Sequence, residues 1–196
     1  MKWEVPEIWP DATVYIIGGG PSVNDFDLSR LQGQGVIATN SAFEEVPFAQ
    51  FLCFTDREWW ENNRFKLANF PGVMVTRNPL FRESRRVKFL EPSSVSGLET
   101  RPGYINYAAN TGLWATFLAI KLGASQVVLV GFDCQPVNGR TNYHDRHSNP
   151  GDSRIYQKFL REWDKFSNTL LGYADIINAC PTSAITNFRK VNPNAL

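Results

Sequence analysis

A chain of 196 residues with 20 basic and 19 acidic side chains lacks the excess of positive charge that is typical of nucleic-acid binding. Its apolar content of 43% is enough for the core of one domain, and no apolar run approaches the roughly 18 residues of a membrane span. Three widely spaced cysteines and an N-terminus without an apolar signal sequence favour a reduced, cytoplasmic protein whose single domain covers residues 1–196.

The first predicted strand, at residues 13–17, runs directly into a turn rich in glycine. The residues of this glycine turn are Gly18, Gly19, Gly20, Pro21 and Ser22. Such a turn at the start of an α/β domain exposes backbone N–H groups to an anionic ligand. It differs from the standard phosphate loops, because no lysine follows Gly20 and Val23 stands where a dinucleotide fingerprint has glycine. The alternative is a tight turn without a ligand.

Apolar runs alternate with turn and cap residues in the first half of the chain. Strands are predicted at residues 35–39, 51–54, 72–76 and near 87–90. A short helix with Asn24 or Asp25 as its cap is expected around residues 26–31. A second helix is expected at residues 57–68, where Asp56 supplies the cap. The remaining residues before 110 predict loops.

The second half of the chain contains two longer helices. Asn110 begins an apolar helix that ends at Gly123. Residues 134–152 are polar and rich in turn residues, which is typical of a lid. Apolar residues at intervals of three and four then predict an amphipathic helix at residues 153–171. Strands are predicted at residues 126–130 and 174–178, and a turn or short helix is expected after Cys180.

This alternation predicts an α/β fold, namely a Rossmann-like three-layer α/β/α sandwich with a mainly parallel sheet and a small lid segment. Ligands of such folds bind beyond the carboxyl ends of the strands. Polar residues follow five predicted strands, at Gly18–Ser22, Asn40–Ser41, Thr55–Asp56, Gly131–Asp133 and Asn178–Ser183. Their convergence at one edge of the sheet predicts a binding site.

Six segments, taken together, resemble a known family. They are Tyr15–Ser22, Asn40, Asn110–Gly112, Val128–Asp133, Tyr143–Ser148 and Ala179–Ser183. In this order they resemble the bacterial sialyltransferases of the Campylobacter lipooligosaccharide type. The resemblance implies that the glycine turn and Asn40 contact a nucleotide. It also implies that Asn110, Thr111 and Gly112 hold the phosphate and ribose of that nucleotide, and that His147 takes the place of the catalytic histidine.

The chain departs from the family at two places. The family uses lid tyrosines to stabilise the departing phosphate, and here Tyr143 is the only tyrosine of the lid segment. Thr55 or Asp56 replaces the asparagine that reads the nucleotide base. A nucleotide or nucleotide-sugar donor is still expected, and the resemblance suggests one of the CMP type first.

Several side chains are candidates for the chemistry. His147 is the candidate general base, because a neutral imidazole accepts a proton from a hydroxyl near pH 7, and Tyr143 is the second candidate catalytic residue. Thr111 and Ser22, with the N–H groups of Gly19, Gly20 and Gly112, are candidate donors to a phosphate.

Asp56 and Asp133 are candidates for contacts with ribose hydroxyls or a divalent ion, and a plain helix cap is the alternative for Asp56. A metal site formed by His144, His147 and Asp145 or Asp152 is an alternative reading of the lid. Trp59 and Trp60 either line an acceptor pocket or pack in the core.

We therefore expect a nucleotide-dependent transferase of the glycosyltransferase type, with an acceptor of unknown chemistry and with homo-oligomerisation left open. The first alternative is a pyrophosphokinase-like enzyme that uses ATP and Mg²⁺, because the same loop occurs in the related archaeal hydroxymethylpterin pyrophosphokinases. The second is a non-catalytic nucleotide-binding or assembly protein. The segment Asp56–Trp60 is similar to one in phage-encoded proteins, which would place the protein in a host cytoplasm.

Overall fold

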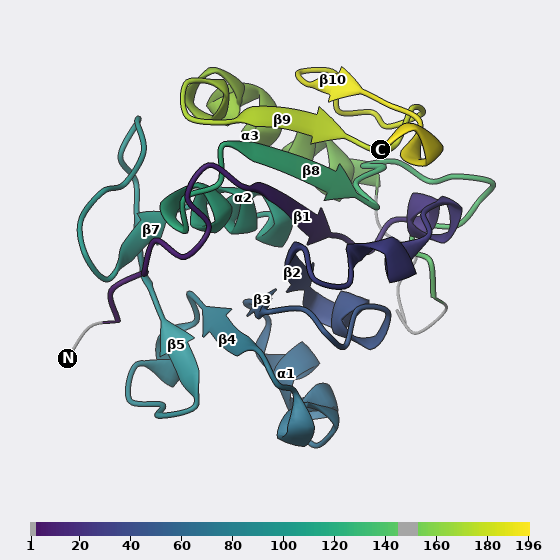
Figure 1. Cartoon of the computed structure of the whole chain (residues 1–196). Coiled ribbons are helices and arrows are strands. Elements are labelled where there is room, and N and C mark those ends of the chain that lie inside the picture. Colours follow the sequence, from purple (N-terminus) through teal and green to yellow (C-terminus); the bar gives the residue numbers. More distant parts are fainter. Residues whose placement is uncertain (1–2, 145–152) are drawn as a thin grey trace.

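The computed structural model describes residues 3–144 and 153–196, and its main feature is one eight-stranded sheet (Figure 1). The strands lie in the order β10–β9–β8–β1–β2–β3–β4–β5, and neighbouring strands are parallel. They are β1 (Thr13–Ile17), β2 (Gly35–Thr39), β3 (Phe51–Phe54), β4 (Val73–Thr76), β5 (Val87–Phe89), β8 (Gln126–Val130), β9 (Asp175–Asn178) and β10 (Arg189–Lys190). The expected α/β fold with a mainly parallel sheet is confirmed.

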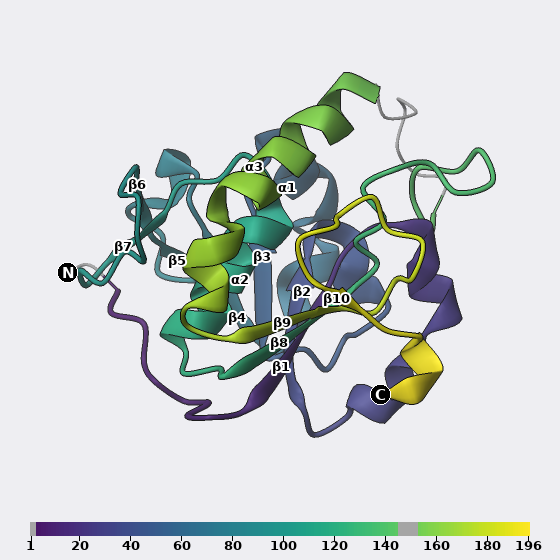
Figure 2. The ribbon, with the colours of Figure 1, turned by 90° about the horizontal axis from the view of Figure 1, so that it is seen from above.

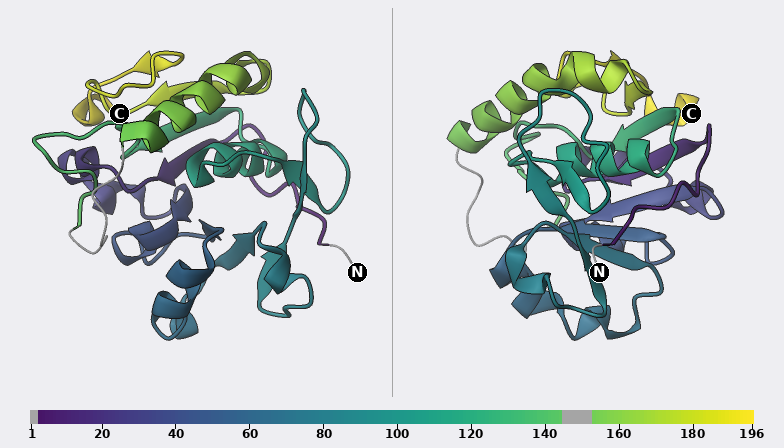
Figure 3. Two further views of the ribbon diagram at one scale, coloured as in Figure 1. Left: turned by 180° about the vertical axis from the view of Figure 1, so that it is seen from behind. Right: turned by 90° about the vertical axis from the view of Figure 1, so that its left-hand side faces the viewer.

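Different kinds of helix cover the two faces of this sheet. The longer helices α2 (Thr111–Lys121) and α3 (Ser153–Leu171) lie on one face, in front of the strands when the molecule is seen from behind (Figure 3). The other face is covered by α1 (Arg57–Asn63) and by short 3₁₀ helices, which include Pro21–Asp25, Leu28–Leu31 and Asn40–Glu44. Within the described part of the chain, no helix has the length and apolar content needed to cross a membrane.

The register of the central strands decides which residues meet at the carboxyl edge. Ile17 at the end of β1 pairs with Ala38 of β2 on one side and with Val130 of β8 on the other. These strands therefore end at the same level. The residues that follow these strands are Gly18, Asn40 and Gly131, and they leave the sheet next to one another. The glycine turn therefore lies beside the segments that follow β2 and β8.

The short helices differ from the sequence expectation. Asp27, rather than Asn24 or Asp25, caps the helix Leu28–Leu31, because its carboxylate accepts hydrogen bonds from both the N–H and the hydroxyl of Ser29. The helix predicted at residues 57–68 ends at Asn63, whose side-chain amide donates to the carbonyl of Trp59 at 2.7 Å. An asparagine that competes in this way for a helix carbonyl favours termination.

A second, two-stranded sheet was not expected from the sequence. It pairs β6 (Glu91–Ser93) with β7 (Tyr104–Asn106), and strands of three residues are too short to show a hydrophobic period. In the loop that joins β6 to β7, the buried carboxylate of Glu99 accepts hydrogen bonds from Arg101. The ammonium of Lys121, at the end of α2, donates to the Glu99 carbonyl at 2.8 Å. The small sheet thus fixes the C-terminal end of α2.

The C-terminal segment packs beside the 3₁₀ helices that follow the glycine turn (Figure 2). Arg30 of the helix Leu28–Leu31 donates to the carbonyl of Leu196. The last strand, β10, contains only two residues and was likewise not expected from the sequence. The C-terminal end of the described chain is therefore held against the segment that follows the glycine turn, on the side away from the N-terminus (Figure 1).

Candidate functional site

A cavity of about 510 Å³ opens at the carboxyl edge of the sheet, between the glycine turn, the start of α2 and the first turns of α3. Most of the predicted site residues line it. They are Gly18, Gly19, Gly20, Asn40, Asn110, Thr111, Gly112, Asp133 and Tyr143. Asn40 reaches this position from a left-handed backbone conformation, with φ of +49°, which asparagine tolerates better than most residues.

Other predicted site residues are absent from the described lining. Pro21 begins a 3₁₀ helix, and Asp56 caps α1 by accepting a hydrogen bond from the N–H of Trp59 at 2.6 Å. Thr55 is directed into the protein, where its buried hydroxyl has no hydrogen-bond partner among the described residues. Ser22 lies behind the glycine turn. His147 and the alternative metal ligands Asp145 and Asp152 fall outside the described residues.

The glycine turn is held by the strand beside it. The N–H groups of Gly18 and Gly20 donate to the carbonyls of Val130 and Gly131 at 2.7 and 2.8 Å. None of the three glycines has a positive φ, so left-handed geometry does not explain them. The N–H of Gly19 donates to no described residue, and a side chain at this position would meet only the amide oxygen of Asn142 at 3.4 Å. Gly19 is therefore the point of the turn that is open to a ligand.

The carboxylate of Asp133 holds the glycine turn through hydrogen bonds to Ser22. One of its carboxylate oxygens accepts hydrogen bonds from the hydroxyl of Ser22 at 2.8 Å and from its N–H at 3.3 Å. The other accepts one from the thiol of Cys180 at 3.4 Å, and burial raises the pKa of that thiol. Asp133 is 1% exposed. Because both oxygens are engaged within the protein, the carboxylate positions the turn, and Ser22 is not directed at a phosphate as the sequence suggested.

The start of α2 is also tied to the protein. The side chain of Asn110 caps the helix, accepting hydrogen bonds from the N–H groups of Gly112 at 2.7 Å and Leu113 at 3.2 Å. The N–H of Gly112 is thus already used, contrary to its expected role as a phosphate donor. The hydroxyl of Thr111, which lines the cavity, makes no hydrogen bond to a described residue.

The lid segment is anchored through Tyr143. Its N–H donates to the carbonyl of Gly19 at 3.0 Å, and its hydroxyl donates to the carbonyl of Ser41 at 2.9 Å. The hydroxyl of Ser41 in turn accepts a hydrogen bond from the indole of Trp59 at 3.0 Å. Trp60 stacks on Phe54, with ring centroids 5.1 Å apart. Both tryptophans are half-buried and pack against the core, and neither belongs to the described lining of the cavity, which favours core packing over an acceptor pocket.

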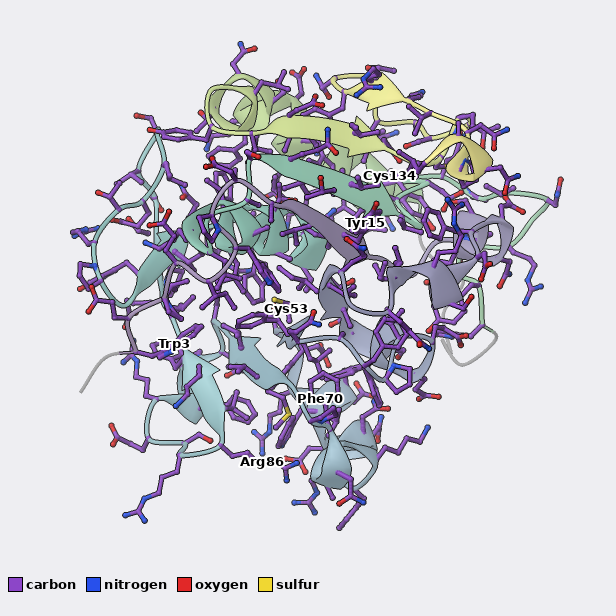
Figure 4. All side chains as sticks on the ribbon, in the orientation of Figure 1. Trp3, Tyr15, Cys53, Phe70, Arg86 and Cys134 are labelled. Atoms are coloured by element: carbon purple, nitrogen blue, oxygen red, sulfur yellow. The ribbon has the colours of Figure 1, made fainter. Side chains whose placement is uncertain are left out.

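Sequence reasoning missed the wall that α3 contributes. Ile155, Tyr156 and Phe159 line the cavity, whereas the spacing of Ile155 and Phe159 predicted only the apolar face of an amphipathic helix. The hydroxyl of Tyr156 donates to the carbonyl of Thr141 at 3.4 Å, and burial raises its pKa. The sequence held one signal for this wall, because the helix directly follows the polar segment 134–152. Cys134 also lines the cavity, just beyond the end of β8 (Figure 4).

The charge of the cavity is low. Among the described lining residues there is no lysine or arginine, and Asp133 is the only carboxylate. His144 lines the cavity and contacts the ring of Tyr143. A phosphate in this space would be held by backbone N–H groups, hydroxyls and amides rather than by cationic side chains.

Comparisons with known proteins found likeness at the level of structure. Neither the protein-family models nor the curated proteins gave a significant match to the sequence. The sialyltransferase CstII from Campylobacter jejuni, in complex with the substrate analogue cytidine-5'-monophosphate, superposes with a TM-score of 0.57 at 15% identity, covering 94% of this chain and 86% of that chain.

Two further structures from Campylobacter jejuni give similar values. The monofunctional α-2,3-sialyltransferase Cst-I has a TM-score of 0.54 at 12% identity, covering 91% of this chain and 79% of that chain. An α-2,3-sialyltransferase in its apo form has a TM-score of 0.52 at 14% identity, covering 96% of this chain and 83% of that chain. At these identities the likeness shows that the chain shares the fold of the Campylobacter sialyltransferases.

Proposed function

We propose that this protein is a nucleotide-dependent glycosyltransferase that binds a donor sugar linked to a nucleoside monophosphate. The observation that carries the proposal is Gly19, whose N–H has no described partner and whose missing side chain leaves space within the cavity. The hydroxyl of Thr111 lines the same cavity and supplies a second donor to a phosphate. The shared fold with sialyltransferases, one of which is described in complex with CMP, supports the same reading.

The low charge of the cavity favours a donor with one phosphate. A triphosphate carries several negative charges, which proteins usually neutralise with lysine, arginine or Mg²⁺. The described lining offers no lysine or arginine and a single carboxylate whose oxygens are already engaged. Asp56, the second carboxylate that a pyrophosphokinase-like site would use, caps α1 instead. These contacts weigh against the ATP- and Mg²⁺-dependent alternative.

In the proposed reaction, a hydroxyl oxygen of the acceptor attacks the anomeric carbon of the donor sugar. The bond between that carbon and the phosphate oxygen breaks, and the nucleoside monophosphate leaves with the bonding electrons. His147 accepts the proton of the acceptor hydroxyl. The N–H of Gly19 and the hydroxyl of Thr111 stabilise the charge on the departing phosphate. Tyr143 holds the lid segment through its contacts with the carbonyls of Gly19 and Ser41.

Calorimetric titration with CMP, UMP, AMP and ATP, each with and without Mg²⁺, tests the binding step. We expect a nucleoside monophosphate to bind without a requirement for Mg²⁺. The variant Thr111→Val, which removes the hydroxyl at nearly constant volume, is expected to weaken that binding about tenfold. The matched control is Thr100→Val, at an exposed position outside the described cavity lining. Binding of ATP with Mg²⁺ in preference to every monophosphate would favour the pyrophosphokinase alternative.

Turnover separates an enzyme from a binding protein. A panel of nucleotide-sugar donors is incubated with the protein, and release of the free nucleotide is measured with and without added acceptor sugars. We expect release from one donor and a loss of about 10²–10⁴-fold in rate for His147→Ala with nucleotide affinity retained. Nucleotide binding without turnover of any donor would instead support the non-catalytic assembly protein.

A further inference from the structure

The backbone segment that leads into α2 is held by a carboxylate from α3. Glu162 accepts a hydrogen bond from the N–H of Ala109 at 2.8 Å and another from the N–H of Asn110 at 3.2 Å. Both Ala109 and Asn110 line the cavity. The N-terminus of α2 is therefore fixed by a negative charge that belongs to the protein itself and lies directly behind the cavity wall.

This placement affects any anion that enters the cavity. The free N–H groups at a helix N-terminus attract negative charge. At α2 the N–H groups of Ala109 and Asn110 are taken by Glu162, and those of Gly112 and Leu113 are taken by the cap. The attraction that remains for a ligand is accordingly reduced, and the carboxylate of Glu162 adds repulsion.

A buried cation lies behind the same segment. Arg77 is 6% exposed, donates to the carbonyl of Ala108 at 2.5 Å, and lies against the rings of Tyr107 and Trp114. Burial lowers the pKa of Arg77 to about 10, while Tyr107 and then Glu162 oppose this shift. Arg77 does not belong to the cavity lining. Its charge therefore stabilises the ionised form of Glu162 and offsets part of its negative charge from the core, without offering a contact to a ligand.

We propose that Glu162 is a specificity-determining residue, which makes the cavity favour ligands with one phosphate over those with two or three. This inference rests on the proposed nucleotide-binding function and goes beyond it by naming the residue that sets the charge of the ligand. Each additional phosphate brings negative charge toward a site that has the Glu162 carboxylate beside it and no lysine or arginine in its described lining. At an effective dielectric of about 20, unit charges roughly 8 Å apart alter an affinity by tenfold or more.

The test measures the affinities of CMP, CDP and CTP for the full chain at constant, low ionic strength without Mg²⁺. The variant Glu162→Gln removes the charge but keeps a side-chain oxygen that accepts a hydrogen bond from the backbone. We expect it to raise the affinity for CTP relative to CMP by tenfold or more. Asp164→Asn is the matched control, because it makes the same charge change at an exposed position on the same helix. It is expected to leave this ratio within about twofold.

A second measurement needs no variant. Added salt screens repulsion between charges. In the wild type, raising the ionic strength is therefore expected to improve the affinity for CTP relative to CMP, whereas a site that attracts the extra phosphates would show the opposite trend. Hydrogen exchange at the amides of Ala109 and Asn110, compared between wild type and Glu162→Gln, verifies that the backbone contacts persist.

The outcomes distinguish this inference from the proposed function. If CMP binds but the CTP-to-CMP ratio is unchanged in folded Glu162→Gln, the role of Glu162 is wrong and the proposed function stands. If the wild type prefers CTP and that preference weakens with salt, the inference is also wrong. If no nucleotide binds to the wild type, both proposals are overturned.

Discussion

Gly19 differs from its neighbours Gly18 and Gly20 in how much space surrounds the Cα atom. A Cβ atom on Gly18 would lie 2.6 Å from the carbonyl oxygen of Gly131, and one on Gly20 would lie 2.0 Å from the carboxylate of Asp133. A Cβ atom on Gly19 would meet only the flexible amide of Asn142 at 3.4 Å. Two of the three glycines are therefore required by the packing of the protein, and one is required only if a ligand occupies the cavity.

The contrast shows that a glycine-rich turn is not by itself evidence of a ligand site. The start of α2 makes the same point, because a Cβ atom on Gly112 would lie 1.9 Å from the ring of Phe132. Close approach within the protein therefore accounts for Gly18, Gly20 and Gly112 among the glycines that line the cavity. Substitutions at the glycine turn should consequently separate into those that damage folding and one that affects binding.

The largest effect is expected for Gly20→Ala. The new methyl group would displace the carboxylate of Asp133, breaking its contacts with Ser22, and would also press on the carbonyl of Gly131. We expect a loss of about 3 kcal/mol or more in the free energy of unfolding, measured by urea denaturation. Gly97→Ala, where no described atom lies within 4 Å, is the control with a change below about 0.5 kcal/mol. Equal stabilities of the two variants would contradict the packing role of Gly20.

An intermediate effect is expected at the other end of α2, away from the cavity. Hydrogen bonding by Arg101 lowers the pKa of Glu99 to about 2, so the folded pKa lies below the unfolded value. The resulting stabilisation is present above about pH 4.5 and is lost as the pH falls toward 2. Glu99→Gln should therefore cost on the order of 2 kcal/mol at pH 7, and this difference should vanish near pH 2.

Unfolding curves recorded from pH 7 to pH 2 for wild type and Glu99→Gln measure this dependence. Because Glu99 does not line the cavity, its substitution should leave nucleotide affinity unchanged at pH 7. A constant stability difference at all pH values would show that the carboxylate charge contributes nothing. A change in affinity would show that the small sheet and the cavity are coupled through α2.

The smallest effect on stability is expected for Gly19→Ala. Its φ is not positive, so alanine can adopt the same backbone conformation and the free energy of unfolding should change by less than about 1 kcal/mol. Nucleotide affinity, by contrast, should fall about tenfold or more, because the methyl group occupies the space next to the exposed N–H. Unaltered affinity in a folded Gly19→Ala protein would remove Gly19 from the binding site.

The sequence predicted the elements that packing dictates. The strand at residues 13–17 and the helix at residues 153–171 have the predicted bounds, because β-branched runs and a helical period identify buried surfaces directly. The carboxyl-edge rule also predicted correctly that the segments after β1, β2 and β8 line a common cavity, whereas Thr55–Asp56 and Asn178–Ser183 do not belong to its described lining. The strands β6 and β7 were missed, since three residues carry no period.

The roles of individual polar residues were harder to predict. Ser22 and the N–H of Gly112 looked like donors to a ligand, but the first is bound to Asp133 and the second to Asn110. Sequence patterns indicate which residues approach a site, whereas they do not show which hydrogen bonds the protein has already satisfied internally. Glu162 illustrates the reverse case, because nothing in its helical pattern indicates that it reaches the segment before α2.

Helix α3 has one further consequence for how this protein can change. Its later residues Trp163, Phe166 and Leu170 are buried in the core, while Ile155 and Tyr156 near its beginning face the cavity. The orientation of the helix is thus set by the half that does not touch a ligand. Substitutions at Ile155 and Tyr156 can therefore reshape this wall of the cavity with little cost to folding, which makes the beginning of α3 the natural place to engineer new acceptor preferences.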